Sequence, residues 1–184
     1  MGKLILFNMM TIDGFFEGKN KEIDWHQVDS EFNNFAIEQL DSASTLVFGR
    51  ITYQLMAGYW PTKKAEVDDP IVAERMNAIS KVVFSKTLDR VEWPNTRLYS
   101  NNIENVIKAL KTNSDKNIFI FGSANLASNV RPFGLIDEYR IMINPVLLGQ
   151  GQELFRQKNQ RLNFKLINCR AFSSGNVLLQ YEPK

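Results

Sequence analysis

The sequence has very little cysteine and histidine, and this scarcity excludes several kinds of chemistry. Its 184 residues include one cysteine and one histidine. A lone Cys169 cannot form an internal disulfide, and one cysteine with one histidine cannot form a nitrogen–sulfur metal cluster. His26 stands beside Trp25 in an expected loop, where packing or solvent contact is favoured over catalysis. We therefore expect no bound metal and a reducing, cytoplasmic location.

Long apolar runs and an excess of one charge are missing too. No segment reaches the roughly 18 apolar residues of a membrane span, and the apolar run at residues 3–7 is too short for a signal peptide. The 22 basic and 20 acidic side chains give a net charge of +2. They are scattered, so neither nucleic acid nor a membrane is expected as a partner. Gly-x-Ser-x-Gly and phosphate-loop lysine motifs are absent as well.

The order of the expected elements indicates an α/β fold in a single domain that spans residues 1–184. Strands are expected at 3–10, 45–48, 81–84, 97–99 and 117–121. Helices are expected between them at 30–40, 52–56, 102–111 and 123–130, and another begins with Asp69 as its N-cap and Pro70 at its first position. The polar stretch 61–69 is expected to be a loop. Three further strand candidates without a long helix between them predict an antiparallel ending, at 137–144, 162–169 and 177–181.

Two of these strands run into a glycine and then a helix, at Gly49 and at Gly122. A glycine at such a junction lets backbone N–H groups approach a ligand closely, and the helix N-terminus favours an anion. Arg50 has a guanidinium suited to phosphate, and Ser85 and Lys86 follow the next strand. If these loops meet, they form a phosphate pocket for a dinucleotide such as NADP(H). If they do not, the glycines only end their strands.

Four segments, in chain order, resemble one protein family. They are Met10-Thr11-Ile12-Asp13-Gly14, Val47-Phe48-Gly49-Arg50-Ile51-Thr52-Tyr53, Ile120-Phe121-Gly122-Ser123, and Asn144-Pro145-Val146-Leu147-Leu148-Gly149-Gln150-Gly151 with Leu154-Phe155. On these motifs the chain is identified as a member of the dihydrofolate-reductase-like superfamily. It is most similar to the C-terminal reductase domain of the riboflavin-biosynthesis deaminase-reductase.

The resemblance implies a fold and a function. The fold would have three layers around a mixed, mostly parallel sheet flanked by helices, with an antiparallel C-terminal hairpin. The function would be hydride transfer from NADPH to a small heterocyclic or carbonyl substrate, similar to 5-amino-6-(5-phosphoribosylamino)uracil reductase. Relatives are often homodimers, so a homodimer is expected.

The same resemblance implies which residues hold the cofactor. The adenosine 2′-phosphate would contact Gly49, Arg50, Thr52, Ser85 and Lys86. The pyrophosphate would contact the second junction, at Phe121, Gly122, Ser123, Ala124 and Asn125. The nicotinamide would lie beside Asn8, Met9 and Ile12. Family members often have two glycines where this chain has Gly122-Ser123, so the serine can serve only if its φ is not forced to be positive.

The substrate side depends on two acids and several aromatic residues. Asp13 can orient substrate or a proton-donating water, or simply cap its turn. Glu31 is the nearest match to the acid that dihydrofolate reductases place on the helix after the first loop, and no basic cluster for a substrate phosphate is found near that loop. The apolar walls would be Trp25, Phe32, Phe35 and Trp60, with core packing as the alternative for the phenylalanines. Two other functions stay open, namely a dihydrofolate reductase and a non-catalytic NADP(H)-binding or sensing protein.

Overall fold

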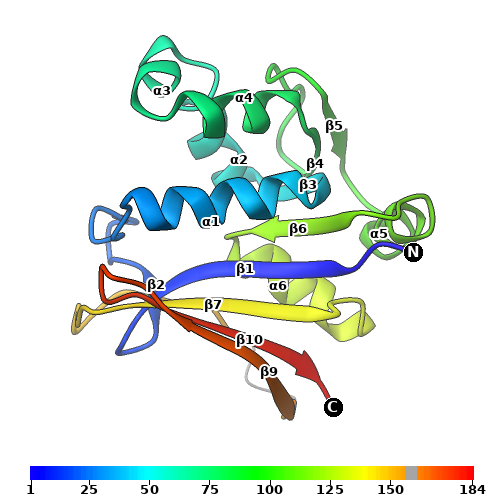
Figure 1. Cartoon of the computed structure of the whole chain (residues 1–184). Helices are drawn as coiled ribbons and strands as arrows, with labels where there is room; N and C mark the ends of the chain where they lie inside the picture. Colours follow the sequence, from blue (N-terminus) through cyan, green and yellow to red (C-terminus); the bar gives the residue numbers. More distant parts are fainter. Residues whose placement is uncertain (156–160) are drawn as a thin grey trace.

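In the computed structural model, which describes residues 1–155 and 161–184, eight strands form one sheet (Figure 1). Six strands pair in parallel and the last two are joined to them by antiparallel pairing, which confirms the mixed sheet with its C-terminal hairpin. The strand order from edge to edge is β5 (Thr96–Tyr99), β4 (Ser80–Phe84), β3 (Ala43–Gly49), β6 (Asn117–Phe121), β1 (Leu4–Thr11), β7 (Glu138–Asn144), β10 (Val177–Pro183) and β9 (Phe164–Ala171).

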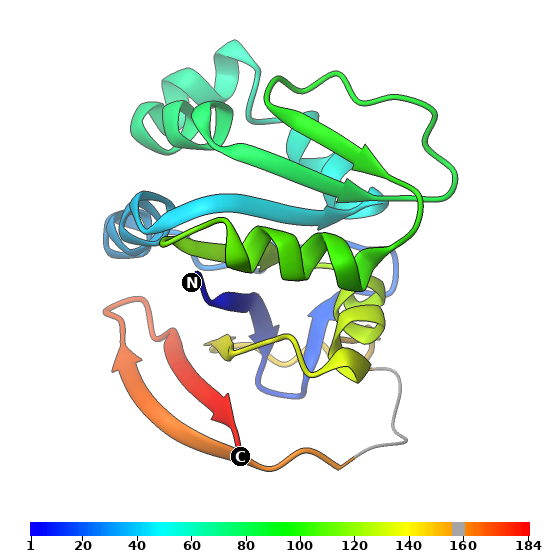
Figure 2. The same ribbon diagram turned by 90° about the vertical axis from the view of Figure 1, so that its right-hand side faces the viewer.

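Helices cover both faces of this sheet, which gives three layers (Figures 1 and 2). One face packs against α1 (Ser30–Asp41), α2 (Arg50–Ala57) and α4 (Pro70–Ala78), and the other against α5 (Ile103–Thr112) and α6 (Ala124–Val130). In β1, Ile5 and Phe7 point to the α1 side, whereas Leu4 and Leu6 point to the α6 side. All four are buried, because a central parallel strand is covered on both faces and is therefore apolar along its length.

One expectation about the segment before α4 is wrong and another is confirmed. Residues 61–69 are not simply a loop, because they contain the short helix α3 (Lys63–Asp68), whose N-cap hydroxyl, Oγ1 of Thr62, accepts from the amide of Ala65 at 3.3 Å. Asp69 is the N-cap residue of α4 and Pro70 begins that helix, as expected, although the side chain of Asp69 makes no capping bond. It accepts instead from Nδ2 of Asn33 at 2.6 Å and so joins α1 to α4.

The C-terminal part differs from expectation in one respect. The segment 137–144 forms β7, which pairs antiparallel with β10 as expected for the ending, but on its other side β7 pairs in parallel with β1, which was not expected. The short helix α6 and the 3₁₀ turn η1 (Arg131–Phe133) serve as the crossover that a parallel connection requires. Two very short strands, β2 (Phe15–Glu17) and β8 (Gln152–Glu153), form a separate antiparallel pair beside the sheet.

The parallel strands place several loops at one edge of the sheet. Because their carboxyl ends meet there, the turns after β1, β3, β4 and β6 gather at that edge. The helix α1 returns from this edge, and its N-cap Asp29 accepts from the amide of Phe32 at 2.8 Å. Within the described ranges, no helix combines the length and the hydropathy of a membrane span.

Candidate functional site

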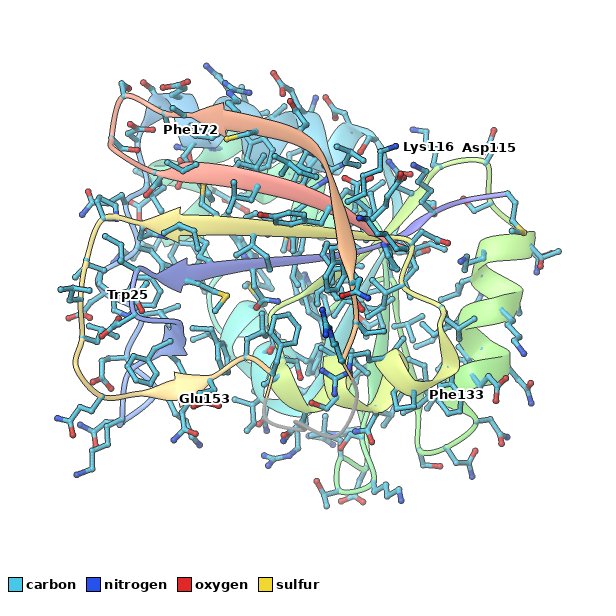
Figure 3. The ribbon with its side chains drawn as sticks, turned by 90° about the horizontal axis from the view of Figure 1, so that it is seen from below. Trp25, Asp115, Lys116, Phe133, Glu153 and Phe172 are labelled. Carbon is cyan, nitrogen blue, oxygen red and sulfur yellow. The ribbon has the colours of Figure 1, made fainter. Side chains whose placement is uncertain are left out.

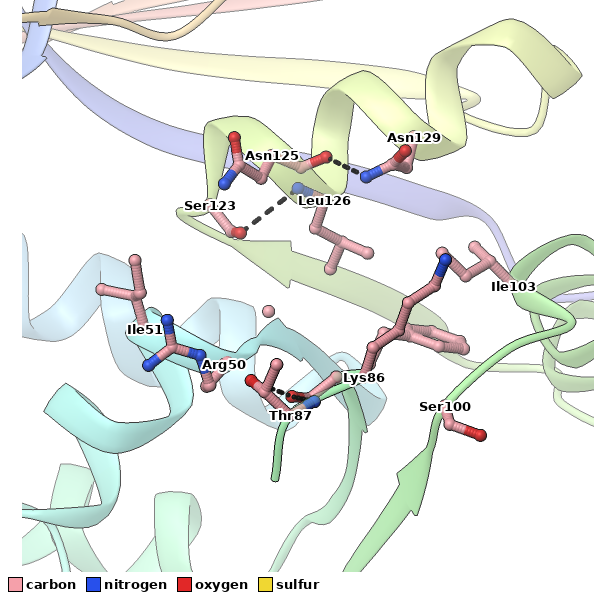
Figure 4. Close-up of a pocket in the computed structure, with 13 residues that line it drawn as sticks. Arg50, Ile51, Lys86, Thr87, Ser100, Ile103, Ser123, Asn125, Leu126 and Asn129 are labelled. Atoms are coloured by element: carbon pink, nitrogen blue, oxygen red, sulfur yellow. Dashed lines mark hydrogen bonds between the residues drawn. The ribbon is translucent and has the colours of Figure 1, made fainter. Parts of the chain in front are cut away.

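A pocket of about 260 Å³ lies at the carboxyl edge, between the turns that follow β3, β4 and β6 (Figure 4). The structure thus brings together the two glycine junctions, which follow the neighbouring strands β3 and β6, and the turn after β4, which lies on the other side of β3. Ser100, Ile103 and Asn129 add to the walls. The lining residues that were expected from the sequence are Gly49, Arg50, Ser85, Lys86, Ser123 and Asn125.

The charges of this pocket are of one sign. Arg50 and Lys86 reach it from two different turns, and none of the residues that line it is acidic. Nη1 of Arg50 donates to Oε1 of Gln54 at 3.1 Å. The turn that carries Lys86 is held by Oγ of Ser85, which accepts from the amides of Thr87 and Leu88 at 3.1 and 3.0 Å. Two cations without a neighbouring acid favour an anionic ligand.

The two glycine junctions are packed against each other. A Cβ at Gly49 would collide with Oγ of Ser123, and a Cβ at Gly122 would lie 3.3 Å from Cγ2 of Thr52. Each junction therefore needs its glycine because of a side chain on the other. Sequence reasoning did not anticipate this contact, since no pattern within one junction refers to the second.

The serine after Gly122 has an unfavourable backbone. Ser123 has φ +66° and ψ 83°, in the left-handed region that L-residues other than glycine rarely adopt. Its Oγ accepts from the amide of Leu126 at 3.3 Å and caps α6. The condition set by the sequence, a φ that is not forced to be positive, is therefore not met, and the chain keeps a serine in a glycine conformation.

The residues expected beside the nicotinamide lie next to this pocket but do not line it. Met9 is buried under α1, and Asn8 is buried on the opposite side of β1, where its Nδ2 has no partner in residues 1–155 or 161–184. Ile12 is 61% exposed in the following turn. The amide of Gly122 donates to the carbonyl of Phe7 at 3.2 Å, which ties the second junction to β1. Of the remaining expected residues, Phe121 is half-buried at the end of β6, Thr52 packs on Gly122, and Ala124 is buried.

The carboxylate of Asp13 is already engaged by the protein. It accepts from Oγ1 of Thr11 at 2.6 Å and from the amides of Leu148 and Gly149 at 3.1 and 2.7 Å. These bonds, that of Thr11 first, hold the pKa of Asp13 below its usual value. Its catalytic role stays a prediction, while its observed role is to fasten the turn after β1 to the loop after β7.

Glu31 is engaged as well. It accepts from the amide and the hydroxyl of Ser173 at 2.8 and 3.0 Å, and Nη2 of Arg170 lies 3.3 Å from its Oε1. The bonds from Ser173, and then the charge of Arg170, lower the pKa of Glu31. The carboxylate therefore joins α1 to the β9–β10 hairpin.

The aromatic residues separate into core and surface. Phe35 is 5% exposed and contacts the rings of Phe7, Phe32 and Phe172, so the expectation that it lines a substrate wall is corrected to core packing. Phe32 and Trp60 are half-buried on the α1 side.

Trp25 and His26 lie in the loop before α1. Trp25 is 9% exposed, and its Nε1 has no partner among the described residues. Its ring contacts that of His26 at 4.5 Å. Burial lowers the pKa of His26 to about 4, so its imidazole is neutral at pH 7. No group of three or more metal-ligating side chains occurs in the part of the chain that the structure describes.

Comparison with known proteins identifies relatives that span the whole chain. The family model of the RibD C-terminal domain matches residues 2–178. The uncharacterized protein YyaP of Bacillus subtilis (strain 168) is 36% identical over 182 residues, which cover 97% of this chain and 94% of YyaP.

Solved structures share the fold. One is a protein of Shewanella sp. PV-4 whose name assigns it provisionally to riboflavin biosynthesis, with a TM-score of 0.77, 22% identity and 99% of both chains covered. Another is the dihydrofolate reductase of Enterococcus faecalis in complex with NADP(H), with a TM-score of 0.66, 13% identity, and 100% of this chain and 97% of that chain covered.

Proposed function

The chain belongs to the RibD C-terminal domain family, and from this premise we propose that it is an NADPH-dependent reductase of a small heterocyclic or carbonyl substrate. One observation carries the proposal: Arg50, at the start of α2, and Lys86, in the turn after β4, line the same acid-free pocket as Ser123 (Figure 4). A guanidinium and an ammonium in one pocket favour a phosphate group, and an additional phosphate monoester is what distinguishes NADPH from NADH.

The residues at this edge fit such a cofactor. Arg50, Lys86 and Ser85 would hold the 2′-phosphate, and the turn at Gly122 would face the pyrophosphate, although the positive φ of Ser123 does not meet the condition that the sequence set for this role. Within the part of the chain that the structure describes, Nδ2 of Asn8 has no hydrogen-bond partner, which leaves a buried donor beside the expected nicotinamide position. When bound, the cofactor supplies the hydride, and the protein contributes orientation and electrostatics.

The test is titration with NADPH and with NADH, followed by tryptophan fluorescence. Arg50→Ala removes one charge-assisted contact worth about 1.5–3 kcal/mol. The affinity for NADPH should therefore fall roughly 10- to 150-fold, and the affinity for NADH should change little. Arg161→Ala is the matched control. This exposed arginine precedes β9, which is the outermost strand on the side of the sheet away from β3 and β4. An equal loss of affinity for NADPH and NADH would show that Arg50 does not bind the 2′-phosphate.

A second candidate is a binding or sensing protein that uses the same pocket without catalysis. The engagement of both Asp13 and Glu31 by protein donors favours it, because neither carboxylate is left to act as an acid. NADPH oxidation with any acceptor would exclude it. Turnover of dihydrofolate that Glu31→Gln abolishes would instead favour a dihydrofolate reductase.

We also propose that the protein is a homodimer that associates through β9. This strand lies at the edge of the sheet and exposes Leu166 by 50% and Ile167 by 40%. An exposed apolar edge strand is a template for pairing with a second chain. Sedimentation equilibrium of the protein and of Ile167→Lys tests this, with a monomeric wild-type protein as the contrary result.

A further inference from the structure

The α1 side of the carboxyl edge carries an aromatic surface beside the ends of β1 and β6. We call it the α1-side surface, and it consists of Phe32, Met56, Trp60 and Phe121. All four are half-buried and pack on the core that contains Phe7 and Phe35. The ring of Phe121 meets that of Phe7 edge-on at 5.8 Å, and that of Phe32 lies 6.3 Å from Phe35. Anchored rings of this kind offer a planar ligand a preformed apolar contact.

No positive charge belongs to the segments that form this surface. Neither lysine nor arginine occurs in residues 9–18, 30–41, 51–62 or 117–126. Arg50 lies one residue before the third segment, but it lines the pocket between β3, β4 and β6. Arg170, behind α1, is matched by Glu31 at 3.3 Å and Glu38 at 3.7 Å. The segments that carry the surface therefore hold no cation for a substrate phosphate, and Lys19, Lys63 and Lys64, which directly follow two of these segments along the chain, are exposed.

The carboxylates around the surface are occupied as well. Asp13 and Glu31 accept the bonds described above. Asp29 caps α1 through the amide of Phe32, and Asp69 accepts from Asn33. A cationic substrate would need one of these groups as its partner, and taking one would break a contact that holds the site together. An uncompensated charge placed on this surface is costly, whichever its sign.

We infer that the hydride acceptor of this protein is a small uncharged aromatic or conjugated carbonyl compound, rather than a phosphate ester or a cation. The inference rests on the proposed reductase function and names its substrate class. In the reaction the carbonyl carbon gains the hydride and forms a C–H bond, while the C=O π electrons move to oxygen. The oxygen takes a proton from water, and NADPH is left as NADP⁺.

The test compares three benzaldehydes that differ in charge at the para position. They are 4-methoxybenzaldehyde, 4-formylphenyl phosphate and 4-formyl-N,N,N-trimethylanilinium. Calorimetric titration of the full chain saturated with NADP⁺ measures binding without turnover. The neutral aldehyde should bind at least tenfold more tightly than either charged one. Equal or tighter binding of a charged aldehyde, or no binding of the neutral one at millimolar concentration, would overturn the inference.

A pair of variants locates the binding. Phe32→Leu keeps an apolar contact with the core but removes a ring. The affinity for 4-methoxybenzaldehyde should therefore fall about fivefold or more. Phe133→Leu is the control, because Phe133 is 43% exposed in η1, at the end of the molecule opposite to Trp25 (Figure 3). Equal affinities of both variants and the wild type would show that the aldehyde binds elsewhere, against the inference.

NADPH consumption with the same aldehydes separates this inference from the proposed function. Fast reduction of the phosphate ester would overturn the substrate class and leave the reductase function standing. Selective binding of the neutral aldehyde without NADPH consumption would support the ligand class and remove the reductase function.

Discussion

Replacing Ser123 should reveal how much stability the second junction gives up to keep a serine. The residue holds φ +66°, and its Oγ caps α6. Ser123→Ala loses the cap but keeps a Cβ in the left-handed region. Ser123→Gly loses the cap too, but it adopts this conformation without strain. The two variants therefore differ mainly in backbone strain.

The magnitudes follow from the two effects. A left-handed conformation costs an L-residue about 1–2 kcal/mol, and loss of a serine cap costs about 1 kcal/mol when alanine replaces it but only a few tenths for glycine. Ser123→Ala should therefore be about 1 kcal/mol less stable than wild type, and Ser123→Gly up to about 1 kcal/mol more stable. At about 2–4 °C per kcal/mol for a chain of this size, their Tm values should differ by about 4–8 °C in calorimetry.

A double-mutant cycle extends this prediction to the contact between the junctions. Gly49→Ala introduces a Cβ that collides with Oγ of Ser123. In the Ser123→Gly background that oxygen is gone, so Gly49→Ala should be less destabilising there by about 1 kcal/mol or more. If Ser123→Ala were as stable as Ser123→Gly, the backbone strain at position 123 would be refuted. If the stability changes at positions 49 and 123 were additive, the contact between the two junctions would be refuted.

Three further predictions concern charged and titrating groups. Burial lowers the pKa of His26 to about 4. The unfolded chain binds a proton at this histidine from about pH 6.5 downward, but the folded protein does so only near pH 4. The free energy of unfolding should therefore fall by about 3 kcal/mol between pH 6.5 and 4. The free energy of unfolding of His26→Gln, measured in urea, should not fall in this way. An equal fall between about pH 6.5 and 4 in both proteins would show that His26 does not cause it. Burial lowers the pKa of Lys81, whose Nζ donates to three carbonyls, to about 8. The unfolded chain then binds more protons between pH 8 and 10.5, so the contribution of Lys81 to stability should rise with pH across that window and be absent in Lys81→Met; an identical alkaline profile of the variant would exclude it. Asp13→Asn should speed amide exchange at Leu148 and Gly149 and leave NADPH affinity unchanged, whereas unchanged exchange would show that the carboxylate does not hold that loop.

Much of the fold could be predicted because its signals are local. The apolar run of β1 and the glycine after β3 each identify an element within ten residues. That Arg50 and Lys86 share a pocket followed from a general rule, since the carboxyl ends of parallel strands meet at one edge. The parallel pairing of β7 with β1 was missed because a short helix and a 3₁₀ turn made the crossover. The helix α3 was missed because six residues are too few for a helical period to show.

The roles of the two acids could not be predicted, because their partners are remote in sequence. Glu31 meets Ser173 across 142 positions, and Asp13 meets Gly149 across 136. No motif around either acid refers to those partners. The conformation of Ser123 could not be predicted for the same reason. Its side chain packs against Gly49, which is remote in sequence, and no neighbour along the chain indicates this contact.

The central position of β1 has a consequence for how the protein is made. Its neighbours in the sheet are β6 and β7, which begin at Asn117 and Glu138. On the ribosome, at about 5–20 residues per second, the first of them appears roughly 6–20 s after β1. Throughout that interval a strand that is apolar on both faces has no partner. The nascent chain therefore keeps an apolar segment unpaired, and its folding depends on pairings that only its second half can complete.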